Sequence, residues 1–173
     1  LAIWSSALSD AQVTTIYTTQ AGASPSPVPT TEMDSSWAPY WTNVWGYWKL
    51  NEPASSTTAY DASGNNRSGT VGSAVTLGSA GKLVTAGSFD GTSNAKVSVS
   101  KTTTGLTAPT VMAWVKPTDF TTNRPIFYNK GDQALAATNG FFLDLLQTSG
   151  LLRLDLGGTS VSSTLAISSG SWT

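Results

Sequence analysis

Short apolar runs recur along most of the chain, and their spacing is that of β-strands. From about Trp37 onward, alternating or β-branched residues fill short segments, and clusters of Gly, Asn, Asp and Ser separate them. The predicted strand runs are 44–50, 75–77, 95–99, 110–115, 125–129, 140–146, 151–156 and 160–167. No helical periodicity of useful length appears after Trp37. The pattern therefore predicts an all-β fold, an antiparallel β-sandwich.

The first residues follow a different pattern, that of a strand end leading into one short helix. Residues 1–4 suit a buried strand. Ser9 and Gln12 have the spacing of a capping box, and Leu8 precedes the cap as in a hydrophobic staple. The apolar stripe of this helix is Val13, Ile16 and Tyr17, and Gly22 is a plausible stop. A helix this short is marginal unless it packs on a body of protein. That body is either a preceding domain or the domain that follows.

Residues 23–36 interrupt the apolar pattern with a segment rich in Pro, Ser and Thr. Pro25, Pro27 and Pro29 alternate along it, which favours extended, semi-rigid chain. This segment is predicted to be a linker between residues 1–22 and a domain over 37–173.

Composition narrows the functional classes. Charged residues make up 11% of the 173 residues, and the formal net charge is −1. Scattered Lys and Arg offer no basic stripe, so nucleic acid is not an expected partner. No apolar run approaches the about 20 residues needed to span a bilayer. The sequence has no His and no Cys, which excludes Ser-His-Asp and Cys-His nucleophiles, His or thiolate zinc sites and disulfides within it.

Seven short motifs occur in one order across residues 45–172. They are 47–52 (YWKLNE), 61–65 (DASGN), 88–92 (SFDGT), 112–117 (MAWVKP), 126–131 (IFYNKG), 140–143 (GFFL) and 170–172 (GSW). Their order resembles laminin G-like, concanavalin A-like jelly-roll domains of bacterial surface proteins. The resemblance implies that 1–22 is the closing strand and helix of a preceding repeat, and that 37–173 is the N-terminal part of an incomplete jelly roll in a tandem array. The alternative is a circular permutation in which 1–22 completes the same sandwich.

The same resemblance implies a non-catalytic recognition or adhesion module, extracellular or on a bacterial cell surface, that binds a glycan or an extracellular protein and adjoins further repeats. A structural spacer without ligand and an accessory domain of a carbohydrate-active enzyme are the alternatives. Related glucanases carry a Glu-x-Asp-x-x-Glu pattern. Glu32-Met33-Asp34 begins that pattern, but Trp37 stands at its last position. Catalysis is therefore not expected.

Two kinds of site are candidates. Trp37 and Trp41 precede the first domain motif and are the carbohydrate-binding candidates, since flat aromatic rings pack against sugar C–H faces; packing of the linker on the sandwich is the other interpretation. Trp48 is expected in the core. Relatives of this fold often hold calcium, and the oxygen ligands available are on Asp61, Asn65 and Asp90. The alternative is that both Asp carboxylates accept backbone N–H groups within their own turns.

Overall fold

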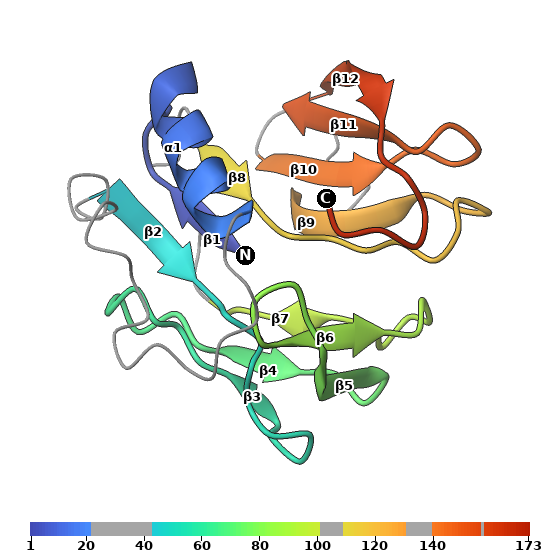
Figure 1. Ribbon diagram of the computed structural model, residues 1–173. Coiled ribbons are helices and arrows are strands. Elements are labelled where there is room, and N and C mark those ends of the chain that lie inside the picture. Colours follow the sequence, from blue (N-terminus) through green and yellow to red (C-terminus); the bar gives the residue numbers. More distant parts are fainter. Residues whose placement is uncertain (22–42, 101–108, 131–139, 157) are drawn as a thin grey trace. The chain divides into compact units, whose positions relative to one another are not determined.

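A computed structural model describes residues 1–21, 43–100, 109–130, 140–156 and 158–173. These residues form antiparallel sheets with one short helix, α1 (Asp10–Ala21), near the N-terminus (Figure 1). The all-β, antiparallel, sandwich-like class predicted from the strand pattern is confirmed. The finer jelly-roll order stays a prediction.

The chain divides into two compact units, Leu1–Met112 and Ala113–Thr173, called unit 1 and unit 2 below. Unit 1 holds α1 and eight strands among its described residues. These strands are β1 (Ala2–Trp4), β2 (Val44–Tyr47), β3 (Thr58–Ala59), β4 (Gly69–Val71), β5 (Val75–Ala80), β6 (Thr85–Phe89), β7 (Val97–Ser98) and β8 (Thr110–Met112). Their sheet orders are β2-β1-β8, β3-β4-β7 and β5-β6.

The N-terminal strand β1 is the central strand of its sheet. Ala2 lies opposite Tyr47 of β2 on one side and opposite Met112 of β8 on the other, both antiparallel. All three residues of β1 are buried. The N-terminal strand therefore docks on strands β2 and β8, which follow it in the chain, one of the two possibilities that the sequence left open. The assignment of 1–22 to a preceding repeat stays a prediction.

Helix α1 begins as its capping box predicts. The Ser9 N–H donates to Oε1 of Gln12 at 2.7 Å, and the Gln12 N–H donates to Oγ of Ser9 at 3.4 Å. The helix contributes Ile16 to a core cluster of unit 1, which also contains Ala2, Trp4, Val44 and Tyr47. Helix and strand thus share one core.

Unit 2 is built on one four-stranded antiparallel sheet of order β12-β11-β10-β9. Its strands are β9 (Arg124–Lys130), β10 (Gly140–Leu145), β11 (Leu151–Leu156) and β12 (Thr159–Ala166). One face of β10 is apolar: Phe141, Leu143 and Leu145 are buried, and Phe141 stacks on Phe127 with ring centroids 5.0 Å apart. The opposite face carries the polar and aromatic residues described below.

A tight turn joins β10 to β11 and needs a glycine. Gly150 has a φ of +63°, and its N–H donates to the carbonyl of Leu146. A Cβ at this position would lie 2.9 Å from the Phe120 ring and from the Ile167 carbonyl oxygen. The hydrogen-bonded hairpin between the two strands therefore depends on the absence of a side chain here.

Candidate functional site

The Asp61 carboxylate organises a turn in unit 1. Its Oδ1 accepts N–H groups from Tyr47 at 3.0 Å and Ser63 at 2.9 Å, and its Oδ2 accepts the N–H of Arg67 at 2.9 Å. Burial alone would raise the pKa of Asp61, but these hydrogen bonds favour the ionised form and lower the pKa below its usual value. The carboxylate ties β2 to the turn by hydrogen bonds to both segments.

Asn65 and Arg67 reach from the same turn to the backbone of β2. The Asn65 Nδ2 donates to the Val44 carbonyl at 2.9 Å, and an Arg67 Nη1 donates to the Trp45 carbonyl at 2.8 Å. The Arg67 guanidinium lies over the Trp45 ring, 4.4 Å from its centroid, and the Trp48 indole N–H donates to the Arg67 carbonyl. Trp45 and Trp48 are both buried, which confirms the core prediction for Trp48. These rings hold the turn in place and are not an open platform for a ligand.

Asp90 lies in a separate, exposed turn after β6. Its Oδ1 accepts the backbone N–H of Thr92 at 2.9 Å and the Thr92 hydroxyl at 2.8 Å, and these bonds lower its pKa. Asp61 and Asn65 thus share one turn, and Asp90 belongs to another. Among the described residues, no three Asp, Glu, His or Cys side chains gather as a metal site would require. Calcium at Asp61, Asn65 and Asp90 stays a prediction, and the contacts present favour the turn-forming role.

The two tryptophans predicted to bind carbohydrate, Trp37 and Trp41, lie outside the described residues. The described chain presents a different aromatic surface in unit 2. It comprises Tyr128, Phe142, Asp144, Arg153, Asp155 and Ser160, and is called the Tyr128 face below.

The register of four strands, β9 to β12, brings the Tyr128 face together. On β10, Phe142 and Asp144 alternate with the buried apolar residues and so share the opposite face. Tyr128 of β9 lies opposite Phe142, and the two rings stack with centroids 6.0 Å apart and an interplanar angle of 22°. Tyr128 is 48% exposed. An accessible ring is thereby fixed against the sheet by its neighbour.

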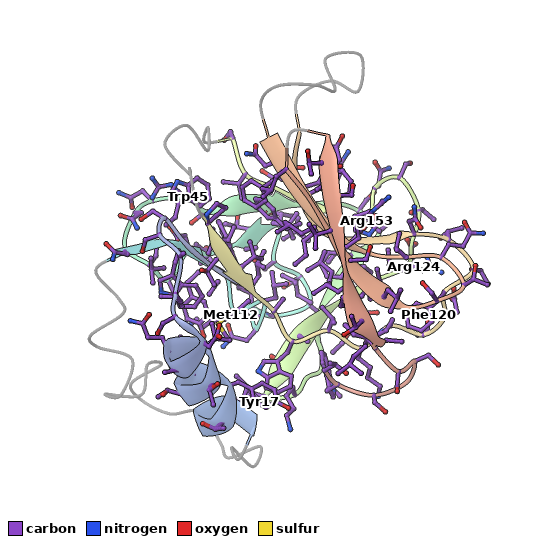
Figure 2. All side chains as sticks on the ribbon, turned by 90° about the horizontal axis from the view of Figure 1, so that it is seen from above. Tyr17, Trp45, Met112, Phe120, Arg124 and Arg153 are labelled. Carbon is purple, nitrogen blue, oxygen red and sulfur yellow. The ribbon has the colours of Figure 1, made fainter. Side chains whose placement is uncertain are left out.

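An arginine holds the other side of Phe142. Arg153 of β11 lies opposite Asp144, and its guanidinium is 4.9 Å from the Phe142 ring centroid. It binds the Asp144 carboxylate at two points, Nε to Oδ1 at 3.0 Å and Nη2 to Oδ2 at 2.5 Å. The hydrogen bond to Asp144 raises the pKa of Arg153. Figure 2 shows Arg153 beside the strands of this sheet. The bidentate ion pair with Asp144 fixes the plane of the Arg153 guanidinium over the Phe142 ring.

The second carboxylate of the Tyr128 face is also an acceptor. Asp155 is buried and accepts the Ser160 hydroxyl at 2.7 Å and the Gly158 N–H at 3.1 Å. Asp144 and Asp155 therefore both serve as hydrogen-bond acceptors inside the sheet. What the Tyr128 face presents to a ligand is the exposed Tyr128 ring, stacked on Phe142, which in turn lies under the Arg153 guanidinium.

The Tyr128 face is the part of the candidate site that the sequence pattern does not reveal. The strands that carry it are predicted, but Asp144 stands out only as a carboxylate that could meet another one. The signal present is the alternation in 140–145 (GFFLDL), where an aromatic and a charged residue share the face opposite Phe141 and Leu143. Its partners Tyr128 and Arg153 become visible only once the strand register is known.

Within the described ranges, no helix is long and apolar enough to cross a membrane. Comparison of the chain with protein-family models, with curated proteins and with solved structures found no significant match.

Proposed function

We propose that the chain is a non-catalytic recognition module of an extracellular or cell-surface protein, and that it binds carbohydrate through the Tyr128 face. The observation that carries the proposal is the half-exposed Tyr128 ring, stacked on Phe142, with the polar side chains of Asp144 and Arg153 further along the same face of the sheet. Sugar rings offer C–H faces to such rings and hydroxyls to the polar groups around them.

Three further features support this function. The chain is poor in charge and rich in Ser, Thr and Gly, as is common in secreted β proteins. Phe142, which is itself held by Arg153, restrains the Tyr128 ring before any ligand arrives, and this reduces the entropy lost on binding. The motif order described above implies a laminin G-like jelly roll, a fold in which glycan and protein recognition are both common. Trp37 and Trp41 remain a second, separate proposal for carbohydrate binding.

The test is a glycan-array screen of the full chain, followed by Tyr128→Ala. Loss of the exposed ring should weaken glycan retention up to about tenfold, because packing of sugar C–H groups on an aromatic ring is worth up to about 1.5 kcal/mol. The matched control is Tyr60→Ala, which removes another exposed tyrosine, in unit 1, and should leave retention unchanged.

Stability measured on the same variants separates binding from folding. Tyr128→Ala is expected to keep the wild-type unfolding midpoint to within a few degrees, since half of its surface is already in water. A chain that retains no glycan would instead support a spacer without ligand. Equal loss of retention in both tyrosine variants would contradict the placement of the ligand on the Tyr128 face.

A further inference from the structure

Four residues of the Tyr128 face form one row across the unit 2 sheet. Tyr128 of β9 lies opposite Phe142 of β10. Phe142 also lies opposite Asp155 of β11, which in turn lies opposite Ser160 of β12. Residues paired in this way project from the same face of an antiparallel sheet. The row therefore crosses all four strands of the sheet (Figure 1), with the Tyr128 ring at one end and the Ser160 hydroxyl at the other.

Both ends of this row are accessible and held in place. The Tyr128 ring is half exposed and stacks on Phe142. Ser160 is exposed, and its hydroxyl donates to Oδ2 of the buried Asp155 at 2.7 Å. Because this bond uses the hydroxyl proton, the Ser160 oxygen can accept a hydrogen bond from a ligand hydroxyl. The row thus offers an aromatic surface at one end and a positioned acceptor at the other.

The middle of the row consists of side chains that are already ordered. Phe142 is half-buried, and the Arg153 guanidinium lies over its ring, held there by Asp144. A ligand that crosses the middle would meet this ordered surface and immobilise little more of the protein. The carboxylates of Asp144 and Asp155 lie beside one guanidinium, which disfavours an acidic sugar. The middle of the row therefore favours a neutral ligand.

The two ends of the row are too far apart for one sugar ring to reach both. Neighbouring strands lie about 4.8 Å apart, so the three strand spacings from β9 to β12 cover about 14 Å, the length of a chain of about three sugar rings. A ligand that contacts both Tyr128 and Ser160 must therefore be an extended chain.

We propose that the ligand class is a linear, neutral oligosaccharide of about three or more residues, which lies across the strands from Tyr128 to Ser160. The inference rests on the proposed function and adds to it the length, charge and direction of the ligand. It uses the face of the sheet and not its edges, so a further strand beside β9 or β12 would leave the row intact.

The test is titration calorimetry of the full chain with two series of neutral, extended oligosaccharides, those of cellulose and those of chitin, from the single sugar to the pentamer. In at least one series the affinity should rise by roughly tenfold up to the trimer and then level off, because longer chains extend beyond the row. Malto-oligosaccharides of the same lengths are the ligand control. Their α-linked chains curve, so their affinity should not rise in this way.

Variants at the far end of the row test the direction of the ligand. Ser160→Ala should lower the affinity for the trimer by about three- to tenfold, the value of one hydrogen bond, and leave the affinity for the single sugar unchanged. Ser160→Thr keeps a hydroxyl and should restore trimer binding. Tyr128→Ala should weaken ligands of every length. Ser88→Ala, at an exposed serine of β6, is the matched control and should bind as the wild type does.

The outcomes separate this inference from the proposed function. If the single sugar binds as tightly as the trimer, or if Ser160→Ala binds the trimer as the wild type does, the row is not the ligand path, although a loss in Tyr128→Ala would still support glycan binding. Binding of neither series overturns the inference even if the glycan array retains a branched or acidic glycan. Retention of no glycan at all overturns both the inference and the proposed function.

Discussion

Asp61 joins distant parts of unit 1 through one side chain. Its carboxylate accepts three backbone N–H groups, from a residue of β2 and from two residues of its own turn. Asp61→Asn replaces one acceptor oxygen by an NH₂ group that faces a donor. Each unmet hydrogen bond costs about 1–3 kcal/mol, so the free energy of unfolding should fall by at least that amount. Urea denaturation followed by tryptophan fluorescence measures the change.

The low pKa of the Asp61 carboxylate should make the stability of the protein fall at acid pH. The folded-state pKa of Asp61 lies below its usual value of 3.8, so its contribution is fully present above about pH 4 and is lost as the pH falls through the folded-state pKa. The free energy of unfolding of the wild type should therefore exceed that of Asp61→Asn by less below pH 4 than at neutral pH. Asp90→Asn is the control, since Asp90 is exposed and its carboxylate accepts hydrogen bonds from Thr92 within its own turn. If Asp90→Asn lowers the free energy of unfolding as much as Asp61→Asn does, the role of Asp61 in joining β2 to its turn is contradicted.

Calcium provides a separate test of these turns. Because the Asp61 oxygens are bonded to N–H groups in the absence of metal, we expect the unfolding midpoint to be the same in millimolar calcium and in EDTA. A bound ion present at 100 times its dissociation constant would add about 2.7 kcal/mol of stability. A clear rise in the midpoint, absent in Asp61→Asn, would instead establish Asp61 as a ligand.

Strand β1 and helix α1 precede the segment 22–42 in the chain, and both pack on strands that follow that segment. The docked element buries Ile3 and Ile16 almost completely, and each contributes about 1.5–3 kcal/mol. If a protease site is introduced within 23–36 and cleaved, residues 1–22 should stay bound through gel filtration. Trp4→Ala removes a fully buried ring of the same element and should release the cleaved peptide. If the cleaved peptide is released from the protein that retains Trp4, β1 does not hold its central position in the sheet.

The elements predicted from sequence are those whose signals are local. The capping box of α1 lies within residues 9–12, and the run 151–156 coincides with β11. Strands β3, β4 and β6 were not predicted, because each is short and rich in Gly, Thr, Ser or Ala, and lacks an apolar alternation. They form through pairing with partners that the sequence does not indicate.

The Tyr128 face could not be predicted for the same reason, since it depends on the register between strands. The local bond from Asp61 to Ser63 follows from turn chemistry, but the bond to Tyr47 does not.

Unit 1 and unit 2 each contain buried apolar residues of their own. In unit 1 these include Ile3, Trp4 and Ile16, and in unit 2 they include Phe141 and Leu145. A chain built in this way can unfold in two steps, because loss of one core leaves the other in place. The alternative, a circularly permuted single sandwich completed by residues 1–22, would unfold as one cooperative body.

Hydrogen exchange on two core variants separates these possibilities. Ile3→Ala and Leu145→Ala each remove a buried side chain and should cost about 2–5 kcal/mol. With independent units, Ile3→Ala accelerates amide exchange in β1, β2 and β8 and leaves β9–β11 at the wild-type rate, and Leu145→Ala does the reverse. The division into two units favours this outcome. If either substitution accelerates exchange equally in both units, the units share one cooperative transition, and residues 1–22 then act as an integral part of a single sandwich.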